Sequence, residues 1–300
     1  MQRRTFLALA SAAATKTLAG TPRPLLFKQA TQTQVVRFIA FGDSGTGDEQ
    51  QAALARAMAV QQTATGFTTA LMLGDNIYPD GNKQDAAAKF ERPYAELLRR
   101  GVKFQAVLGN HDVRKGREWE INYPNFNMGG RAYRSFTLGE NLIEFFALDS
   151  TEYDDAQARW LESALAGSQA RWKIAYFHHP LYSSGSTHGS DPKLRAKLEP
   201  LFVKYNVAAV FSGHDHIYER IKPQQGVQYF VSGAGGKLRR GDLKDHSPLT
   251  VVGNDDESSF MLVEVTAAKI AFKALDATGS VLDSGEILPR AAARAAAAGK

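Results

Sequence analysis

The sequence predicts an α/β fold in which two packed, mixed β-sheets are flanked by helices. Short apolar runs rich in β-branched residues alternate with helical patterns up to Gly213. Beyond Val227 the chain is rich in strand patterns. Alternating β and α units predict one sheet with helices outside it, and the later strands predict a second packed layer.

Each expected strand is a short apolar run that ends near a turn residue. The expected strands are 35–41, 68–73, 102–108, 133–138, 142–148, 172–177, 208–211, 228–231, 260–265, 270–275 and 281–288. Gly139-Glu140-Asn141 separates two of these runs and predicts a hairpin. The expected helices are 48–62, 85–100, 156–165 and 193–205. Pro93 predicts an interruption in the second helix.

The chain divides into three expected parts. Residues 1–30 are expected to be an export signal and linker, residues 31–290 a single domain, and residues 291–300 an Ala-rich tail. No fixed-period repeat and no second domain boundary is visible. The chain has no cysteine, which excludes disulfides and thiolate metal sites.

The formal charge of +5 is concentrated in the first 30 residues, which hold no Asp or Glu. Their basic residues are Arg3, Arg4, Lys16, Arg23 and Lys28. The rest of the chain holds 31 of the 36 Lys and Arg residues against 31 Asp and Glu, and is therefore neutral. Nucleic-acid binding needs basic residues clustered on the folded body, so we expect no nucleic-acid partner.

One basic cluster remains on the body. It consists of Lys237, Arg239, Arg240 and Lys244. We interpret it as a solvated loop, because charged runs usually lie at the surface.

The N-terminus resembles a twin-arginine export signal. Arg3 and Arg4 precede an Ala-rich apolar stretch that is too short to span a bilayer. The sequence allows cleavage near Ala14 or near Ala19. An ordinary basic start to a disordered N-terminus is the alternative. We expect a bacterial protein that is exported to the periplasm or secreted, with no stable membrane insertion after the signal is removed.

Five short segments contain metal-ligand residues, and most of them follow an expected strand. They read Gly42-Asp43-Ser44-Gly45, Gly74-Asp75-Asn76-Ile77-Tyr78, Gly109-Asn110-His111-Asp112, His178-His179-Pro180 and Gly213-His214-Asp215-His216. Ligands in α/β folds collect beyond the carboxyl ends of strands, so we expect the segments to meet. Asp, Asn, His and Tyr together suit two hard or borderline metal ions. Such a pair activates water and binds a phosphoryl group.

Asp75 is the candidate bridging ligand, because one carboxylate can hold two cations about 3.5–4 Å apart. Tyr78 has an ordinary pKa near 10, so binding as phenolate needs a strong Lewis acid and favours Fe(III). Asn110 offers a neutral oxygen suited to a divalent ion. Asp43 could reach a metal from its turn, although alone it would be interpreted as a turn cap.

The histidine after Asn110 is better placed to contact substrate than to bind the same ion. Asp112 is expected either to orient His111 or to cap the following loop. Adjacent side chains of a strand face opposite ways, so we expect one ligand from the pair at 178 and 179. We choose His178 and expect His179 to be packed or hydrogen-bonded structurally.

His214 and His216 are two positions apart in the chain. They lie on one side if the backbone between them is extended. Each can then serve one ion of the pair.

These segments resemble those of the calcineurin-like metallophosphoesterase superfamily, and specifically of its purple acid phosphatase branch. The order GDSG, GDNIY, GNHD, FHHP and GHDH matches that branch in sequence and approximate spacing. Tyr78 is the discriminating residue, because the protein Ser/Thr phosphatases have Asp and Arg in this segment. The resemblance covers residues 35–290. It implies a four-layer αββα sandwich of the compact form, without the N-terminal β-domain of the large plant enzymes.

The resemblance also implies two metal ions, Fe(III) and a divalent ion (Fe, Zn or Mn). The Fe(III) ligands would be Asp43, Tyr78 and His216, bridged by Asp75. The ligands of the divalent ion would be Asn110, His178 and His214. Of the remaining histidines, His111 would contact the substrate, and His188 would bind phosphate or protonate the leaving group.

The implied activity is an acid phosphatase-like hydrolysis of small-molecule phosphate monoesters by a metal-bound hydroxide. A phosphodiesterase or nucleotidase would use the same site. A non-catalytic module that binds metal or phosphate on the same fold is a further alternative. Degenerate copies usually lose ligands, whereas all seven candidate positions here hold suitable residues. Nothing in the sequence specifies an oligomeric state.

Overall fold

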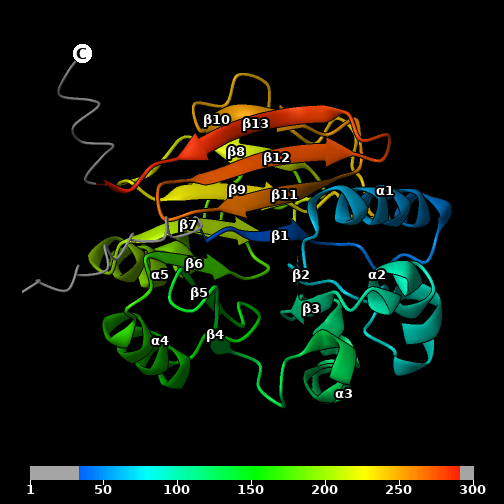
Figure 1. Cartoon of the computed structure of the whole chain (residues 1–300), viewed down its shortest axis with the longest axis horizontal. Helices are drawn as coiled ribbons and strands as arrows, with labels where there is room; N and C mark the ends of the chain where they lie inside the picture. Colours follow the sequence, from blue (N-terminus) through cyan, green and yellow to red (C-terminus); the bar gives the residue numbers. More distant parts are fainter. Residues whose placement is uncertain (1–33, 291–300) are drawn as a thin grey trace, which may run out of the picture. The chain divides into compact units, whose positions relative to one another are not determined.

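Thirteen strands form two sheets in the computed structural model, which describes residues 34–290. The strands are β1 (Val36–Phe41), β2 (Thr69–Met72), β3 (Lys103–Ala106), β4 (Arg134–Leu138), β5 (Ile143–Ala147), β6 (Trp172–Tyr176), β7 (Val207–Ser212), β8 (Tyr218–Ile221), β9 (Gln228–Ser232), β10 (Thr250–Asn254), β11 (Ser259–Val265), β12 (Ile270–Asp276) and β13 (Val281–Ile287). The six-stranded sheet has the order β13-β12-β11-β1-β2-β3. The seven-stranded sheet has the order β10-β8-β9-β7-β6-β5-β4 (Figure 1).

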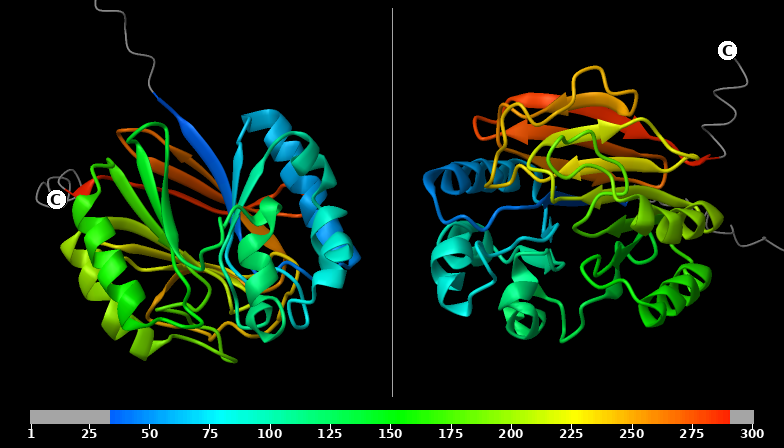
Figure 2. Two further views of the ribbon diagram at one scale, coloured as in Figure 1. Left: turned by 90° about the horizontal axis from the view of Figure 1, so that it is seen from below. Right: turned by 180° about the vertical axis from the view of Figure 1, so that it is seen from behind.

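Helices cover the outer faces of both sheets. They are α1 (Glu49–Thr65), α2 (Ala95–Arg99), α3 (Arg117–Asn122), α4 (Asp155–Gly167) and α5 (Pro192–Lys204). Shorter helical turns are η1 (Lys83–Asp85), η2 (Ala87–Glu91), η3 (Asp112–Arg114) and η4 (Pro124–Phe126). In Figure 2, the blue and cyan helices α1 and α2 lie on one side of the strands, and the green to yellow-green helices α4 and α5 lie on the other.

The alternation of side chains along β1 shows why the layers form. Phe38 and Ala40 belong to the apolar core between the two sheets, whereas Ile39 and Phe41 belong to the core beneath α1 and α2. Successive strand residues point to opposite faces, so a continuously apolar strand fits only where both faces are covered. A third core packs α4 and α5 against the seven-stranded sheet. Each fully buried large side chain stabilises this arrangement by about 1.5–3 kcal/mol.

The carboxyl ends of the parallel strands lie in one region of the molecule. Strands β1, β2 and β3 are parallel in the first sheet, and β5, β6, β7 and β9 are parallel in the second. Antiparallel strands adjoin these parallel sets, with β11 beside β1, β4 beside β5 and β8 beside β9. All five metal-ligand segments of the sequence come directly after parallel strands.

The predicted fold class is confirmed: two mixed sheets are flanked by helices in an α/β arrangement. The hairpin of β4 and β5 is present, and the expected helix 85–100 is interrupted, as Pro93 predicts. Strands β8 and β10 and helix α3 were not predicted. The expected export signal and the tail 291–300 lie outside the described residues.

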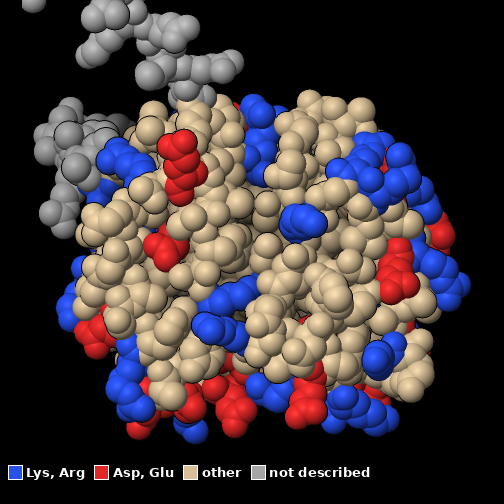
Figure 3. Space-filling model, turned by 60° about the horizontal axis from the view of Figure 1, so that its bottom comes forward, with Lys and Arg blue, Asp and Glu red and all other residues tan. Residues whose placement is uncertain are grey.

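Among residues 34–290, no helix has both the length and the apolar character that a membrane crossing requires. On the face drawn in Figure 3, Lys and Arg side chains form separate patches, and Asp and Glu lie among them. That face has no continuous basic track of the kind that follows a nucleic-acid backbone.

Candidate metal centre

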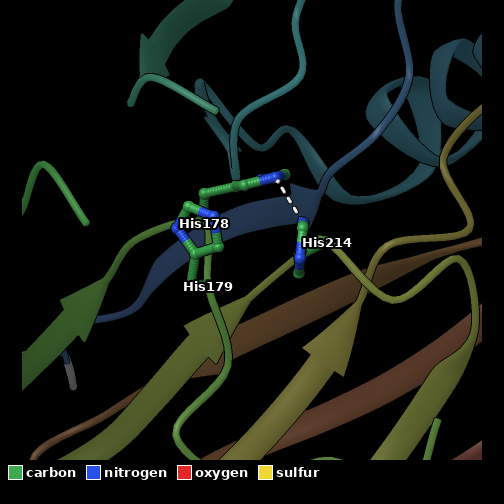
Figure 4. A group of neighbouring side chains, drawn as sticks. All are labelled: His178, His179 and His214. Atoms are coloured by element: carbon green, nitrogen blue, oxygen red, sulfur yellow. Dashed lines mark hydrogen bonds between the residues drawn. The ribbon is translucent and has the colours of Figure 1, made fainter. Parts of the chain in front are cut away.

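Loops from both sheets supply the candidate ligands. Asp43, Asp75 and Asn110 follow β1, β2 and β3 of the six-stranded sheet, and His178 and His214 follow β6 and β7 of the seven-stranded sheet. Figure 4 shows how His178 and His214 approach each other from adjacent loops. The site therefore lies where the carboxyl ends of the two sheets meet.

Three of these residues have a backbone conformation that residues other than glycine rarely adopt. Asp43, Asp75 and His214 have φ angles of 56°, 52° and 73°. Non-glycine residues in this left-handed region are uncommon, and they cluster at functional sites where the surroundings hold them. One such restraint is the His214 amide, which donates to Asp43 Oδ2 at 2.8 Å.

Glycines allow the ligand loops to approach one another closely. A Cβ at Gly109 would lie 2.2 Å from Asp75 Oδ1, and one at Gly213 would lie 2.5 Å from Asp43 Oδ2. Neither distance is compatible with a side chain. The glycines before Asn110 and His214 are therefore needed for the close contact of the segments.

One group of three side chains brings together an anionic, a phenolic and an imidazole ligand. The Tyr78 hydroxyl lies 3.1 Å from Asp43 Oδ1 and 3.2 Å from His216 Nε2. His216 Nε2 and Asp43 Oδ1 are 3.5 Å apart. All three residues are buried. These are the side chains that the resemblance assigns to Fe(III).

A second group of three side chains is neutral. His178 Nε2 lies 3.0 Å from Asn110 Oδ1 and 3.1 Å from His214 Nδ1. His178 Nδ1 points the other way, to the Leu73 carbonyl oxygen at 2.9 Å, which leaves Nε2 free of a proton and able to bind a cation. These are the side chains that the resemblance assigns to the divalent ion.

Asp75 lies between the two groups. Its Oδ1 is 3.5 Å from His178 Nε2 and accepts the His111 amide at 2.9 Å. Ligand atoms of Asp43, Asp75 and His178 all lie within 4.8 Å of one another. Asp75 is therefore close to a member of each group, Asp43 in the first and His178 in the second.

The electrostatics of this cluster fit bound cations. Burial raises the pKa of Asp43 well above its usual range, and the Asp75 carboxylate raises it further. Burial, followed by the charges of Asp43 and Asp75, raises the pKa of Tyr78. Burial lowers the pKa of His178, which favours the neutral imidazole that binds metals. Buried carboxylates packed together need a compensating positive charge, and neutral imidazoles cannot supply it.

His111 lies at the edge of the cluster. Its ring packs against Tyr78 with centroids 4.6 Å apart, and its Nδ1 contacts the Pro79 carbonyl oxygen. Asp112 neither contacts the His111 side chain nor caps the loop that follows it among the described residues, and it has another structural role. Asp112 is fully buried and accepts the amides of Asn76 at 2.8 Å and Gly109 at 2.8 Å. It holds two ligand loops together.

His188 lies on an exposed loop over the second group of ligands. Its ring is 4.1 Å from the ring of His214 at an angle of 30°. The buried Asp215 anchors this loop, because it accepts hydrogen bonds from the Ser183 hydroxyl at 2.5 Å and from the Gly189 amide at 3.1 Å.

His179 is hydrogen-bonded, as expected, but its ring also lies beside the candidate ligands His178 and His214. Strand β6 ends at Tyr176, so strand alternation no longer applies at the histidine pair. Ring nitrogens of His178, His179 and His214 lie within 4.8 Å of one another (Figure 4). His179 Nδ1 lies 2.9 Å from the Ser150 hydroxyl. The predicted hydrogen bond is thus present, on a ring that borders the centre.

His214 and His216 both reach the centre, but not through an extended backbone. The left-handed φ of 73° at His214 turns the chain between them. The hydrogen bond from the His214 amide to the Asp43 carboxylate stabilises this turn.

The basic cluster is not simply a solvated loop. Lys237 Nζ lies 4.2 Å from the centroid of the Tyr78 ring. The Lys237 amide donates to the Asp43 carbonyl at 2.9 Å, and the Arg239 amide donates to the His216 carbonyl at 3.1 Å. Their neighbour Arg240 is exposed and fits the expectation. The sequence offered no local signal for this placement, because the contacts are long-range.

A pocket of about 440 Å³ opens beside the second group of ligands. His179, His188 and His214 line one part of it, and residues 189–193 at the start of α5 line another. The pocket leaves room for a bound molecule beside the candidate ligands.

The family model described as calcineurin-like phosphoesterase matches residues 36–218. The chain belongs to this family. The matched region contains all nine residues predicted as ligands or catalytic groups, from Asp43 to His216.

The curated relatives support the purple acid phosphatase-like branch of the calcineurin-like phosphoesterases. Purple acid phosphatase 7 of Arabidopsis thaliana is 27% identical over 285 residues, which are 85% of this chain and 87% of the relative. Human tartrate-resistant acid phosphatase type 5 is 27% identical over 300 residues, with 83% and 90% covered. The family match and these relatives support a hydrolase of phosphoric esters.

Solved structures agree on the fold. The yellow lupin (Lupinus luteus) purple acid phosphatase PPD1 has a TM-score of 0.73 at 20% identity, covering 86% of this chain and 54% of that chain. GAP50, described as the anchor in the inner membrane complex of Plasmodium, has a TM-score of 0.73 at 21% identity, with 85% and 89% covered. At these identities the likeness concerns the calcineurin-like phosphoesterase fold alone.

Proposed function

We propose that this chain is an acid phosphatase-like enzyme that uses two metal ions to hydrolyse small-molecule phosphate monoesters. The supporting observation is that two groups of three candidate ligand side chains lie on either side of one carboxylate, Asp75. The names of the curated relatives, acid phosphatases among them, agree with this activity.

Asp43, Tyr78 and His216 would hold Fe(III), and Asn110, His178 and His214 would hold a divalent Fe, Zn or Mn ion. When bound, such a pair supplies a nucleophile near neutral pH and neutralises charge on the phosphoryl group. The carboxylates and the phenolate provide three negative charges against five positive charges. The loaded site would therefore attract a phosphate dianion.

Two histidines would act on the substrate directly. His111 is held beside Tyr78, where its ring can donate a hydrogen bond to a phosphoryl oxygen. His188 reaches over His214 from an exposed loop, where it can bind phosphate or give a proton to the leaving oxygen. We propose that residues 31–290 form the single catalytic domain, that the twin-arginine signal exports the folded protein, and that nucleic acid is not a partner.

Metal analysis and a phosphoester panel test this function on the purified full chain. We expect about two metal ions per chain, a visible absorption band from tyrosinate bound to iron, and turnover of monoesters. A colourless, iron-free and fully active enzyme would contradict the Fe(III) assignment. A metal-loaded chain that hydrolyses diesters and no monoester would replace the monoesterase by the phosphodiesterase alternative.

A further inference from the structure

Two basic side chains border the candidate metal centre without being needed to form it. Lys237 Nζ lies 4.2 Å from the Tyr78 ring centroid, and within residues 34–290 no carboxylate lies within ion-pair distance of it. Arg239 has one ion-pair partner there, Asp242, at the long distance of 3.9 Å. At least one positive charge at this edge is therefore unpaired.

The Arg239–Asp242 ion pair leaves a polar atom of each side chain without a hydrogen bond. Arg239 Nη1 and Asp242 Oδ2 are buried atoms that make no hydrogen bond among the described residues. The other oxygen of Asp242 accepts the Thr187 hydroxyl, next to His188. The Arg239 side chain as a whole is 34% exposed, and its guanidinium makes no hydrogen bond among the described residues. Its accessible nitrogens can therefore bind an anion close to the His188 loop.

The backbone fixes where these two residues lie. Lys237 and Arg239 follow the turn Gly233–Gly236, whose Gly235 amide donates to the Gly42 carbonyl at 3.0 Å. The amides of Lys237 and Arg239 are bound to the carbonyls of Asp43 and His216. Both cations are consequently attached to the segments that supply the first group of ligands.

We propose that Lys237 and Arg239 form an anion subsite that favours phosphoric esters whose leaving group carries a second anionic group, such as another phosphate or a carboxylate. This inference deepens the proposed function and rests on it. The reacting phosphoryl group would lie at the metal ions, and the second anion would lie against the ammonium and guanidinium groups. Charge-assisted hydrogen bonds of this kind discriminate strongly when the site is partly shielded from water.

A different role for Lys237 makes a different prediction. The ammonium group over the Tyr78 ring could serve only to stabilise the phenolate. In that case its removal would shift the tyrosinate absorption band and lower the turnover of all esters equally.

The test compares two esters that differ in one charge, phenyl phosphate and 3-carboxyphenyl phosphate. The full chain is assayed as wild type and as Lys237→Met, Arg239→Gln and the double variant. Arg240→Gln is the matched control, because it removes one positive charge from the same loop while its side chain is exposed and bonded to the Asp256 carbonyl oxygen.

For the wild type we expect a higher kcat/KM with the carboxylated ester. In the double variant the ratio of the two kcat/KM values should fall about tenfold, with phenyl phosphate changed less than about twofold. The Arg240→Gln ratio should equal that of the wild type. An unchanged ratio in the double variant, or an equal loss with both esters and a shifted absorption band, overturns the subsite.

A binding measurement separates this inference from the proposed function. Calorimetric titration of the same proteins with inorganic phosphate and with pyrophosphate requires no turnover. We expect the double variant to lose about tenfold in pyrophosphate affinity and little in phosphate affinity. A chain that hydrolyses no ester but shows this difference would contradict the phosphatase and retain the subsite. Equal losses for both anions would contradict the subsite.

Discussion

The phenol oxygen of Tyr78 and the carboxylate oxygen Oδ1 of Asp43 lie 3.1 Å apart in the buried interior. The two residues follow different strands of the same sheet, and His216 from the other sheet lies 3.2 Å from the same phenol oxygen. This contact distinguishes the site from one built only of carboxylates and imidazoles, and it gives the metal assignment an optical test.

Tyr78→Phe removes the phenol oxygen and keeps the ring between His111 and Lys237. We expect the visible band to disappear and iron affinity to fall at least about 100-fold. Mutation of residues that only hydrogen-bond to a metal ligand already lowers metal affinity about 10–100-fold. Absorption spectra and metal analysis of the purified variant measure this. A retained band would assign the colour to another group and remove Tyr78 from the ligand set.

Asp75→Asn should abolish metal retention and turnover together, because a neutral amide cannot replace a shared carboxylate. Asp80→Asn is the matched control, since Asp80 pairs with the exposed Lys115 and such pairs are worth at most about 1 kcal/mol. Metal content and kcat are compared with circular dichroism as a check of folding. Activity that persists in the folded Asp75 variant would eliminate the mechanism.

Gly109→Ala should displace Asp75 without replacing any candidate ligand. The added Cβ would meet Asp75 Oδ1 at 2.2 Å and its amide nitrogen at 2.3 Å. We expect a destabilisation of about 1–3 kcal/mol together with lower metal content. Gly167→Ala is the control, because a Cβ there meets nothing within 4 Å. Equal metal content in both variants would show that the loop shifts to accommodate the added methyl group and would contradict this prediction.

The metal-free protein should lose stability as the pH rises through the neutral range. Burial and then the Asp112 charge raise the pKa of Glu120 well above its ordinary 4.5, and burial raises the pKa of Asp112 to about 8. These two carboxyl groups therefore bind more protons in the folded chain than in the unfolded chain through the neutral range. The contribution of these two groups to the free energy of unfolding falls with rising pH, by at most about 1.4 kcal/mol per pH unit for each group.

Glu120→Gln should flatten that pH dependence, because the amide cannot ionise. Glu118→Gln, on the exposed side of the same helix, should leave it unchanged. Urea unfolding of the metal-stripped proteins at pH 5 and pH 8 measures both slopes. A Glu120 variant whose slope matches the wild type would show that this carboxyl group is charged in the folded chain.

The fold and the ligand loops were predictable because their signals are local. Strands β1, β2, β3 and β7 belong to short apolar runs followed by Gly and a candidate ligand, as at Phe41 to Asp43. That pattern can be recognised without knowing which segments lie nearby in the fold. Strand β8 was missed because Glu219 and Arg220 interrupt its apolar pattern, and each is satisfied only by distant partners: Glu219 accepts the Ser184 amide, and Arg220 pairs with Asp283.

The remaining errors have a common physical cause. The directions of His179 and His214 depend on where β6 ends and on a left-handed turn, and neither is specified by side-chain alternation. Lys237 reaches Tyr78 because the turn Gly233–Gly236 packs on Gly42 and Ser44. Such contacts join segments that are far apart in the chain, so no local pattern predicts them.

Each group of ligands draws residues from both sheets: Asp43 and Tyr78 stand opposite His216, and Asn110 stands opposite His178. The interlayer core, including the edge-to-face contact of Phe38 and Phe211 with centroids 6.0 Å apart, consequently sets the spacing of the ligands. A small sliding of one layer over the other would pull both halves of the centre out of alignment at once. Substitutions deep between the layers should thus impair catalysis before they cause global unfolding.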